Sequence, residues 1–354
     1  MLKEHQPLIT LIIPTYRRPR LLKRAIQSVL TQTYPEYKVC VYDNASGDET
    51  ASVVKDFERK DIRIEYHCHS TNIGMRANFQ YGLKQVDTPF FSFLCDDDII
   101  LPGFFEKALE GFKEYPEAKL STGLAIYTDM KKITNVIPRG IEGYLEPPGS
   151  LLQMIKPAKV QWPVLPATLF RREAIDSIGY FDSETGILGF DLDYMFRIMA
   201  HHPVFVSSTP FAIRVVHPEA ASFARDYQDL WPSWLILIEN LSADKQIPMH
   251  IRTQIENVMT KALALNLLLI GRENIRTKNL ESASKSAELL CNYFKLEKES
   301  KTLYDQIKLR KKHDSIYKIL NLGQSISYLW RWRTVFNFIK LQEQYGSYLQ
   351  YLTT

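Results

Sequence analysis

Short apolar runs of strand length alternate with amphipathic segments along the N-terminal part of the chain. The apolar runs predict strands at residues 8–14, 37–43, 62–66 and 90–95. Between them, apolar residues recur with helical spacing and predict helices at residues 21–31, 48–59 and 75–85. Strands that alternate with helices form mostly parallel sheets with helices on both faces. The pattern therefore predicts an α/β fold whose ligand lies beyond the carboxyl ends of the strands.

The pattern changes after residue 226, where strand-like runs give way to longer helical periodicity. Residues 251–270 and 280–294 are predicted helices, and residues 233–350 contain no convincing strand pattern. We therefore expect an α/β domain in residues 1–225 and a mainly helical domain in residues 226–354. In the last part of the chain, tryptophans and basic residues interrupt the apolar ones, which fits either a packed helical hairpin or an interfacial membrane helix.

The predicted strand at residues 90–95 runs directly into three carboxylates, Asp96, Asp97 and Asp98. Several negative charges at one buried sheet edge are costly unless a cation compensates them. Carboxylate oxygens are preferred ligands of Mg²⁺ and Mn²⁺, and a substrate diphosphate would complete the coordination. The alternative is a solvated acidic loop, which is what most acidic triplets form.

Composition and charge narrow the class of protein further. With 354 residues, of which 45% are hydrophobic, the chain can fill a globular core. Its first residues show no apolar leader pattern, and its longest apolar run, residues 262–270, is too short to cross a bilayer. We expect a cytoplasmic protein, in solution or peripheral at the cytoplasmic face of the membrane. The four cysteines have no CxxC spacing and are predicted to be reduced.

The formal net charge of +4 is unevenly distributed. Residues 301–345 carry nine Lys or Arg residues against Asp305, Asp314 and Glu343. This basic segment predicts that the C-terminal helical region, from about residue 308 onward, serves contact with an anionic membrane surface or self-association. No nucleic acid partner is expected.

Ordered motifs in the chain resemble those of glycosyltransferase family 2, the inverting enzymes with the GT-A fold. These motifs are Pro14-Thr15-Tyr16 with Arg18 and residues 32–35, the segment that begins with Asp43-Asn44, Asn72-Ile73-Gly74 with Asn78, and Asp96-Asp97-Asp98 in the place of the Asp-x-Asp motif. The likeness covers roughly the first 225 residues, and motifs in this order are more specific than any one of them. It implies a Rossmann-like GT-A domain that binds a nucleotide sugar.

Each residue predicted to bind the donor has a chemical role and a structural alternative. Asp43 can accept the imide N–H of a base such as uracil, or it can hold its own turn. Tyr16 can stack on the base or pack against protein, and Arg76, near a helix start, can bind phosphate or face solvent. The resemblance also assigns to the nucleotide-sugar site Pro14, Thr15, Arg18, Asp96 and Asp97, with Asp96 near the ribose.

The resemblance implies that Asp98 is a ligand of Mn²⁺ or Mg²⁺, the expected cofactor. Arg214-Val215-Val216-His217, followed by Pro218 and Ser222, resembles the segment that closes the family's catalytic domain. His217 is expected either to complete the metal shell or touch the diphosphate, or to be structural.

Asp191 falls on the family's catalytic-base position, where it would take the proton of the acceptor hydroxyl. Its structural alternative is a helix cap. Phe190 stands where the family has another acid, and Asp193 is predicted to pair with Arg197 one turn further along the helix. Trp162 lies in the region that lines the family's acceptor pocket and is the predicted sugar-stacking residue.

The residues and the resemblance together predict a metal-dependent inverting glycosyltransferase of polysaccharide or glycan biosynthesis. It would move a sugar from a nucleoside-diphosphate sugar, most readily a UDP-sugar, to a hydroxyl of a saccharide or lipid-linked acceptor. A nucleotidyltransferase that forms nucleotide sugars is a second interpretation, although the loop after the first strand has no glycine. A catalytically inactive GT-A-like binding or scaffold protein is a third, and turnover of a nucleotide sugar separates it from the first.

Overall fold

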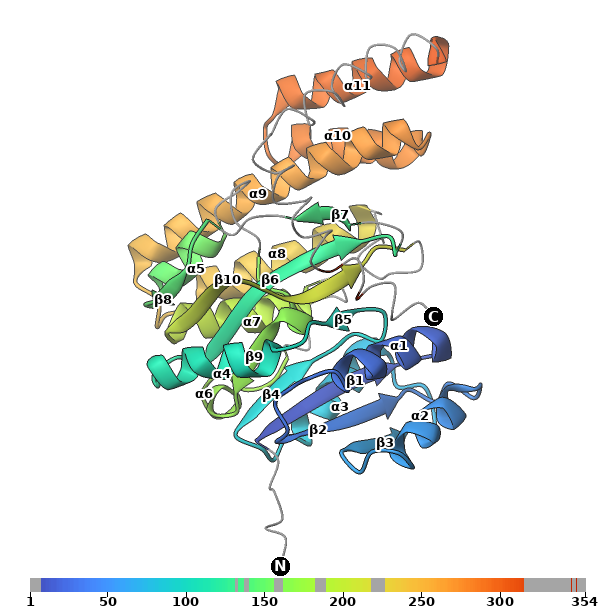
Figure 1. Ribbon diagram of the computed structural model, residues 1–354. Coiled ribbons are helices and arrows are strands. Elements are labelled where there is room, and N and C mark those ends of the chain that lie inside the picture. Colours follow the sequence, from blue (N-terminus) through green and yellow to red (C-terminus); the bar gives the residue numbers. More distant parts are fainter. Residues whose placement is uncertain are drawn as a thin grey trace, which may run out of the picture.

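The computed structural model describes residues 8–130, 133–136, 140–155, 162–181, 189–217 and 227–314, together with Tyr345 and Tyr348 (Figure 1). Its strands are β1 (Ile9–Thr15), β2 (Tyr37–Asp43), β3 (Ile64–Cys68), β4 (Phe90–Phe93), β5 (Ile99–Ile100), β6 (Leu120–Thr128), β7 (Ile133–Val136), β8 (Gly143–Leu145), β9 (Thr168–Arg171) and β10 (Val204–Val215). Its helices are α1 (Pro19–Val29), α2 (Thr50–Glu58), α3 (Met75–Lys84), α4 (Phe104–Glu114), α5 (Gly149–Met154), α6 (Glu173–Ile178), α7 (Phe190–His201), α8 (Tyr227–Ala243), α9 (Met249–Arg276), α10 (Leu280–Asn292) and α11 (Glu297–Lys312).

The described strands form one sheet in the order β3-β2-β1-β4-β9-β6-β10-β5, with β7 beside β6 and β8 beside β10. Strands β3, β2, β1 and β4 are parallel, as their alternation with helices predicted. Beyond β4 the sheet is mixed, because β9 runs antiparallel to both β4 and β6, and β5 and β8 run antiparallel to β10. The α/β fold class is confirmed. The parallel arrangement covers the predicted strands β1 to β4 and recurs between β6 and β10, which the strand–helix alternation did not predict.

Apolar side chains pack on both faces of this sheet. Along β1, Leu11 and Ile13 belong to a core cluster with α1 and α4, whereas Ile12 belongs to a cluster on the opposite face. That second cluster continues without a break into the C-terminal helices, where it includes Leu263 and Leu303. The sheet and the C-terminal helices therefore share one core. The predicted division at residue 225 stays a prediction, because residues 218–226 lie outside the described part.

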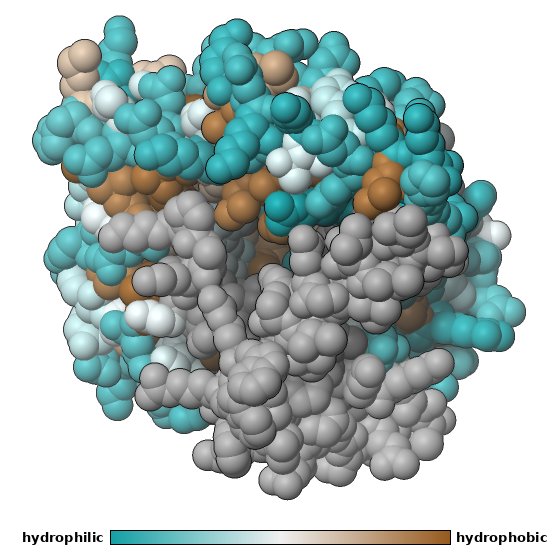
Figure 2. All heavy atoms as spheres, turned by 90° about the horizontal axis from the view of Figure 1, so that it is seen from above, coloured by the Kyte–Doolittle hydropathy of each residue, from teal (hydrophilic) through white to brown (hydrophobic). Residues whose placement is uncertain are grey.

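The helical character of the C-terminal part is confirmed in α8 to α11, which lie on one side of the sheet (Figure 1). Helix α9 is longer than predicted at both ends, and β3 begins at Ile64, two residues after its predicted start. Within the described part, no helix is long and apolar enough to cross a membrane. Seen from above, the coloured residues of this face are mostly hydrophilic, with hydrophobic residues gathered in strips between the polar ones (Figure 2). Leu265 and Leu269 on α9 are among its exposed apolar side chains.

Candidate active site

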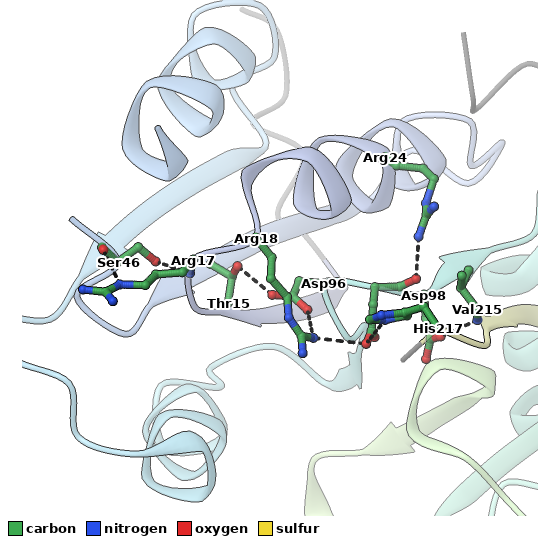
Figure 3. Close-up of polar contacts among 10 residues, drawn as sticks. Thr15, Arg17, Arg18, Arg24, Ser46, Asp96, Asp98, Val215 and His217 are labelled. Atoms are coloured by element: carbon green, nitrogen blue, oxygen red, sulfur yellow. Dashed lines mark hydrogen bonds and ion pairs between the residues drawn. The ribbon is translucent and has the colours of Figure 1, made fainter. Parts of the chain in front are cut away.

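The carboxyl ends of β1, β2 and β4 meet at one edge of the sheet, as the sequence predicted. Thr15 at the end of β1 lies in register with Asp43 at the end of β2. The hydroxyl of Thr15 donates a 2.8 Å hydrogen bond to Oδ2 of Asp96, which follows β4 (Figure 3). Three of the predicted donor-site residues are thus brought together by the parallel strands themselves.

Asp96, Asp97 and Asp98, which we call the acidic motif, are all buried. Arg18, at the N-terminal end of α1, places Nη1 3.1 Å from Oδ1 of Asp96 and 3.1 Å from Oδ2 of Asp97. One guanidinium nitrogen therefore bridges two carboxylates, which lowers the electrostatic cost of placing them side by side.

Two further arginines contribute to this compensation. Nη2 of Arg24 donates a 2.7 Å hydrogen bond to the backbone carbonyl of Asp97, and Nε of Arg214 lies 3.8 Å from Oδ2 of Asp98. The sequence interpretation expected a metal ion to neutralise the motif and did not assign these two arginines to it. The sequence could have indicated such arginines, since three buried carboxylates require compensating charge from elsewhere in the chain.

The arginines do not neutralise the motif completely. Burial, and next the charge of Asp97, raise the pKa of Asp96 to about 6, although Arg18 opposes the shift. Burial and the charge of Asp97 likewise raise the pKa of Asp98 to about 7, although Arg214 opposes it. Additional positive charge would stabilise the charged form of these two carboxyl groups.

The donor atoms at the motif fit such a cation. Nε2 of His217 lies 3.1 Å from Oδ2 of Asp97, and the ligand atoms of Cys95, Asp97 and Asp98 lie within 4.8 Å of one another. Oxygen and imidazole ligands suit Mn²⁺ and Mg²⁺. The predicted metal pair was Asp98 with His217, whereas the structure places His217 beside Asp97. Oδ1 of Asp98 instead accepts the backbone N–H of Val215 at 3.0 Å. Pro218 and Ser222 of the same predicted segment lie outside the described residues.

Asp43 is held by its own turn and by the neighbouring strand. Its Oδ1 accepts the backbone N–H of Ser46 at 3.0 Å and the Ser46 hydroxyl at 2.5 Å. Its Oδ2 accepts the hydroxyl of Tyr66 at 2.6 Å, and only 1% of the residue is exposed. This is the turn role that the sequence left open as an alternative, and recognition of a nucleobase by Asp43 stays a prediction.

The other predicted donor residues lie around this edge. Pro14 is buried within β1, and Tyr16 is exposed beyond it, with the guanidinium of Arg17 5.1 Å from its ring centre. Arg76 is the second residue of α3 and is partly buried. The Asn-Ile-Gly motif shapes the approach to α3, since the side chain of Asn72 accepts the backbone N–H of Gly74 at 2.9 Å.

Asp191 lies in the first turn of α7 and is partly exposed. Its Oδ1 accepts the backbone N–H of Leu192 at 2.9 Å. Burial raises its pKa, while the backbone bond and the charge of Arg214 oppose the shift. Arg214 therefore acts electrostatically on both Asp98 and Asp191, the predicted metal ligand and the predicted base.

The residues beside Asp191 are structural. Asp193 is fully buried and pairs with Arg197 at 2.8 Å, as predicted. Phe190, which stands where the family has an acid, packs its ring against Phe79 and Phe181 at centroid distances of 5.3 and 5.0 Å. This position therefore serves the core.

Trp162 is partly buried between two other aromatic rings. Its ring lies 5.7 Å from that of Phe196 on α7 and 5.0 Å from that of Trp234 on α8. The contacts favour packing between the sheet domain and the helices, and the predicted role of Trp162 in binding the acceptor has not been tested.

The fold and the site define the class, an α/β domain of the GT-A type. Residues 10–179 match the family model described as glycosyl transferase family 2. This part of the chain belongs to glycosyltransferase family 2, and the resemblance seen in the sequence is confirmed.

Similar proteins agree with this assignment. A Campylobacter jejuni protein, GalNAc(5)-diNAcBac-PP-undecaprenol beta-1,3-glucosyltransferase, is 36% identical over 111 residues, which are 30% of this chain and 36% of that protein. The matched parts span 16% to 40% of the length of three such curated relatives.

Solved structures share the fold over most of the chain. S. aureus TarS 1-349 in complex with UDP-GlcNAc has a TM-score of 0.60 and 15% identity, with 86% of this chain and 92% of that chain covered. The mannosyltransferase PcManGT from Pyrobaculum calidifontis, in complex with GDP-Man and Mn²⁺, has a TM-score of 0.56 and 16% identity, with 92% and 88% covered.

Proposed function

We propose that this protein is a metal-dependent inverting glycosyltransferase that moves a sugar from a UDP-sugar to a hydroxyl of a saccharide or lipid-linked acceptor. The observation that carries the proposal is the acidic motif, in which Asp96 and Asp98 keep raised pKa values although three arginines lie beside the motif. A site that remains short of positive charge at the carboxyl ends of parallel strands suits a divalent cation and a diphosphate. Similar folds that were solved with UDP-GlcNAc and with GDP-Man and Mn²⁺ support this choice.

The donor side is proposed to work through charge. Asp97, Asp98 and His217 would hold the cation, which would stabilise the negative charge that develops on the leaving nucleoside diphosphate. Arg18 has 27% of its side chain exposed and already bridges two carboxylates. It can therefore exchange one of them for a phosphate oxygen of the donor without crossing the site.

The acceptor side is proposed to depend on Asp191. Its Oδ1 accepts the Leu192 N–H, and its Oδ2 would accept the acceptor hydroxyl. A raised pKa makes this carboxylate a stronger proton acceptor. As the acceptor oxygen bonds to the anomeric carbon, its proton passes to Asp191 and the bond from that carbon to the diphosphate oxygen breaks. A single displacement of this kind inverts the anomeric configuration.

The acceptor class is proposed from the name of a relative, and the location from the charge of one helix. The name of the C. jejuni relative describes an acceptor linked to undecaprenol through a diphosphate. Helix α11 exposes a set of basic side chains, namely Lys298, Lys301, Lys308, Lys311 and Lys312. These lysines would favour peripheral contact with an anionic membrane face on the cytoplasmic side, where each basic residue near the surface contributes about 1 kcal/mol.

Turnover of a panel of UDP-, GDP- and other nucleoside-diphosphate sugars, with Mn²⁺ and with EDTA, tests the proposal. Binding is measured in parallel by thermal shift, where a hundredfold excess of ligand over Kd should stabilise the protein by about 2.7 kcal/mol. The Asp191→Asn variant serves as a control that should bind the donor and fail to transfer the sugar. Equal UDP affinity in Mn²⁺ and in EDTA would reject metal assistance, and absence of turnover with every donor would favour the inactive scaffold interpretation.

A further inference from the structure

The segment after the acidic motif is held along one side of α1. Arg24, Ser28 and Gln32 lie four residues apart and form a row on this side. The Arg24 guanidinium donates to the carbonyl of Asp97 at 2.7 Å, and the Ser28 hydroxyl accepts the N–H of Ile100 at 3.2 Å. The Gln32 amide donates to the carbonyl of Leu101 at 2.7 Å. A row of polar side chains thus fixes the backbone from Asp97 to Leu101.

The opposite side of the same segment is held by β10. Ile99 and Ile100 form β5, which pairs with residues 212 and 213 of β10. The N–H of Leu101 donates to the carbonyl of Phe211 at 2.8 Å, and Asp98 accepts the N–H of Val215. The position of the acidic motif therefore depends on α1 and β10 together.

A third contact comes from the far end of the chain. Tyr345 and Tyr348 pack against a small buried apolar cluster that consists of Ile99, Leu101, Ile126, Ile213 and Val215. The Tyr348 hydroxyl lies 2.9 Å from Oγ1 of Thr31, just beyond α1, and 3.2 Å from the carbonyl oxygen of Ile100. Tyr348 thus joins the end of α1 to the segment that follows Asp98. At these two positions the C-terminal segment contacts the α/β domain, and the prediction that this segment serves association stays a prediction.

We propose that Tyr345 and Tyr348 form an intramolecular brace that positions the acidic motif for donor binding. Both tyrosines contact the apolar cluster that contains Ile99 and Leu101, the residues that follow the motif in the chain. Its two members stand three residues apart in helical backbone, so their rings can lie over the same cluster. Their contribution is indirect, because the brace acts on the motif through residues 99–101, which the tyrosines contact by packing and by the hydrogen bond of Tyr348 to Ile100.

The proposal rests on the donor site described under the proposed function, but its first test does not. Hydrogen exchange of the backbone amides is measured on the full-length protein without ligand. Replacing Tyr348 with Phe removes one hydroxyl and keeps the ring, so protection at residues 98–101 should fall about three- to tenfold, the scale of one lost hydrogen bond. A chain that ends after residue 344 lacks both rings and should lose more. The amides of β1 should keep their protection in both proteins, which shows that the sheet remains folded.

The second test measures the affinity for UDP in the presence of Mn²⁺ by calorimetry. Tyr348→Phe should raise Kd about three- to tenfold. The matched control is Tyr304→Phe on α11, where the tyrosine is 38% exposed and far from the motif in sequence, and neither exchange nor affinity should change.

The outcomes separate the brace from the proposed function. Unchanged protection at residues 98–101 in the chain that ends after residue 344 would overturn the brace. Lost protection with unchanged UDP affinity would overturn its link to the donor site. If the wild-type protein binds no nucleoside diphosphate at all, the proposed function fails, and the exchange measurement still decides whether the brace exists.

Discussion

The turns that follow β2 and β4 both place buried carboxylates at the same sheet edge, and the two turns stabilise them in different ways. Asp43, the last residue of β2, is bound by neutral hydroxyl and amide donors from Ser46 and Tyr66. The acidic motif, after β4, is compensated by arginines that come from α1 and β10. Both sites accept hydrogen bonds from neutral donors, since Thr15 and Val215 donate to Asp96 and Asp98, but only the acidic motif also has arginines beside it. We therefore expect Asp43 to be structural and the acidic motif to bind a ligand.

Removing a carboxylate of the acidic motif should have the largest effect on activity. Asp98→Asn keeps the shape of the side chain and removes its charge, so it should lower kcat/KM on the order of a thousandfold through the loss of metal-assisted leaving-group stabilisation. The gain in UDP affinity on adding Mn²⁺ should disappear as well, as measured by calorimetry. If this variant keeps both the rate and the metal effect, the contrast between the two turns fails.

Asp191 extends the comparison to a carboxylate that accepts the backbone N–H of Leu192 and has no arginine hydrogen-bonded to it among the described residues. Asp191→Asn should lower kcat by about a hundredfold or more, the usual scale for a lost general base, and leave the donor Kd nearly unchanged. Steady-state kinetics and donor calorimetry on the same preparation check the split. Loss of donor affinity with kcat preserved would move Asp191 to the donor site.

Removing a hydrogen bond from Asp43 at the end of β2 should lower the stability of the protein. Tyr66→Phe removes the donor to Oδ2 of Asp43 and should lower the free energy of unfolding by about 1–3 kcal/mol. Chemical denaturation measures the loss, and Tyr304→Phe serves as the control. Metal-dependent UDP binding should be retained. A large loss of UDP affinity without a loss of stability would support base recognition by Asp43 and would contradict a purely structural role for it.

The smallest expected effect is the pH dependence of the metal-free protein. The pKa values of Asp96 and Asp98, about 6 and about 7, lie above their ordinary value of 3.8. Between these limits the folded state binds more protons than the unfolded state, so stability falls as pH rises from about 4 to 7. Thermal unfolding in EDTA should show this slope, and Asp98→Asn should flatten it. Addition of Mn²⁺ at pH 8 should restore stability in the wild type only.

The sequence predicted the parts of the fold that depend on local periodicity. Strands β1, β2 and β4 and helix α1 follow from apolar spacing, and their parallel order brings Thr15, Asp43 and Asp96 together. Strand β5 has two residues, and its pairing with β10 joins positions more than a hundred residues apart, so no local pattern could reveal it. The same holds for Arg214 and for Tyr348, whose partners are distant in sequence. Trp162 illustrates the reverse case, because its residue type fits both a sugar platform and an interdomain contact.

Helix α1 has a practical consequence for measurement. It contacts the motif through Arg18 and Arg24, while Lys23 points outward and is exposed. A fluorescent probe attached at Lys23→Cys would sit on the solvent side of the helix that borders the donor site, and Cys68 is the other exposed thiol that would need replacement. Such a labelled protein would convert donor and metal binding into an optical signal. It would allow candidate sugars to be screened before any acceptor is known.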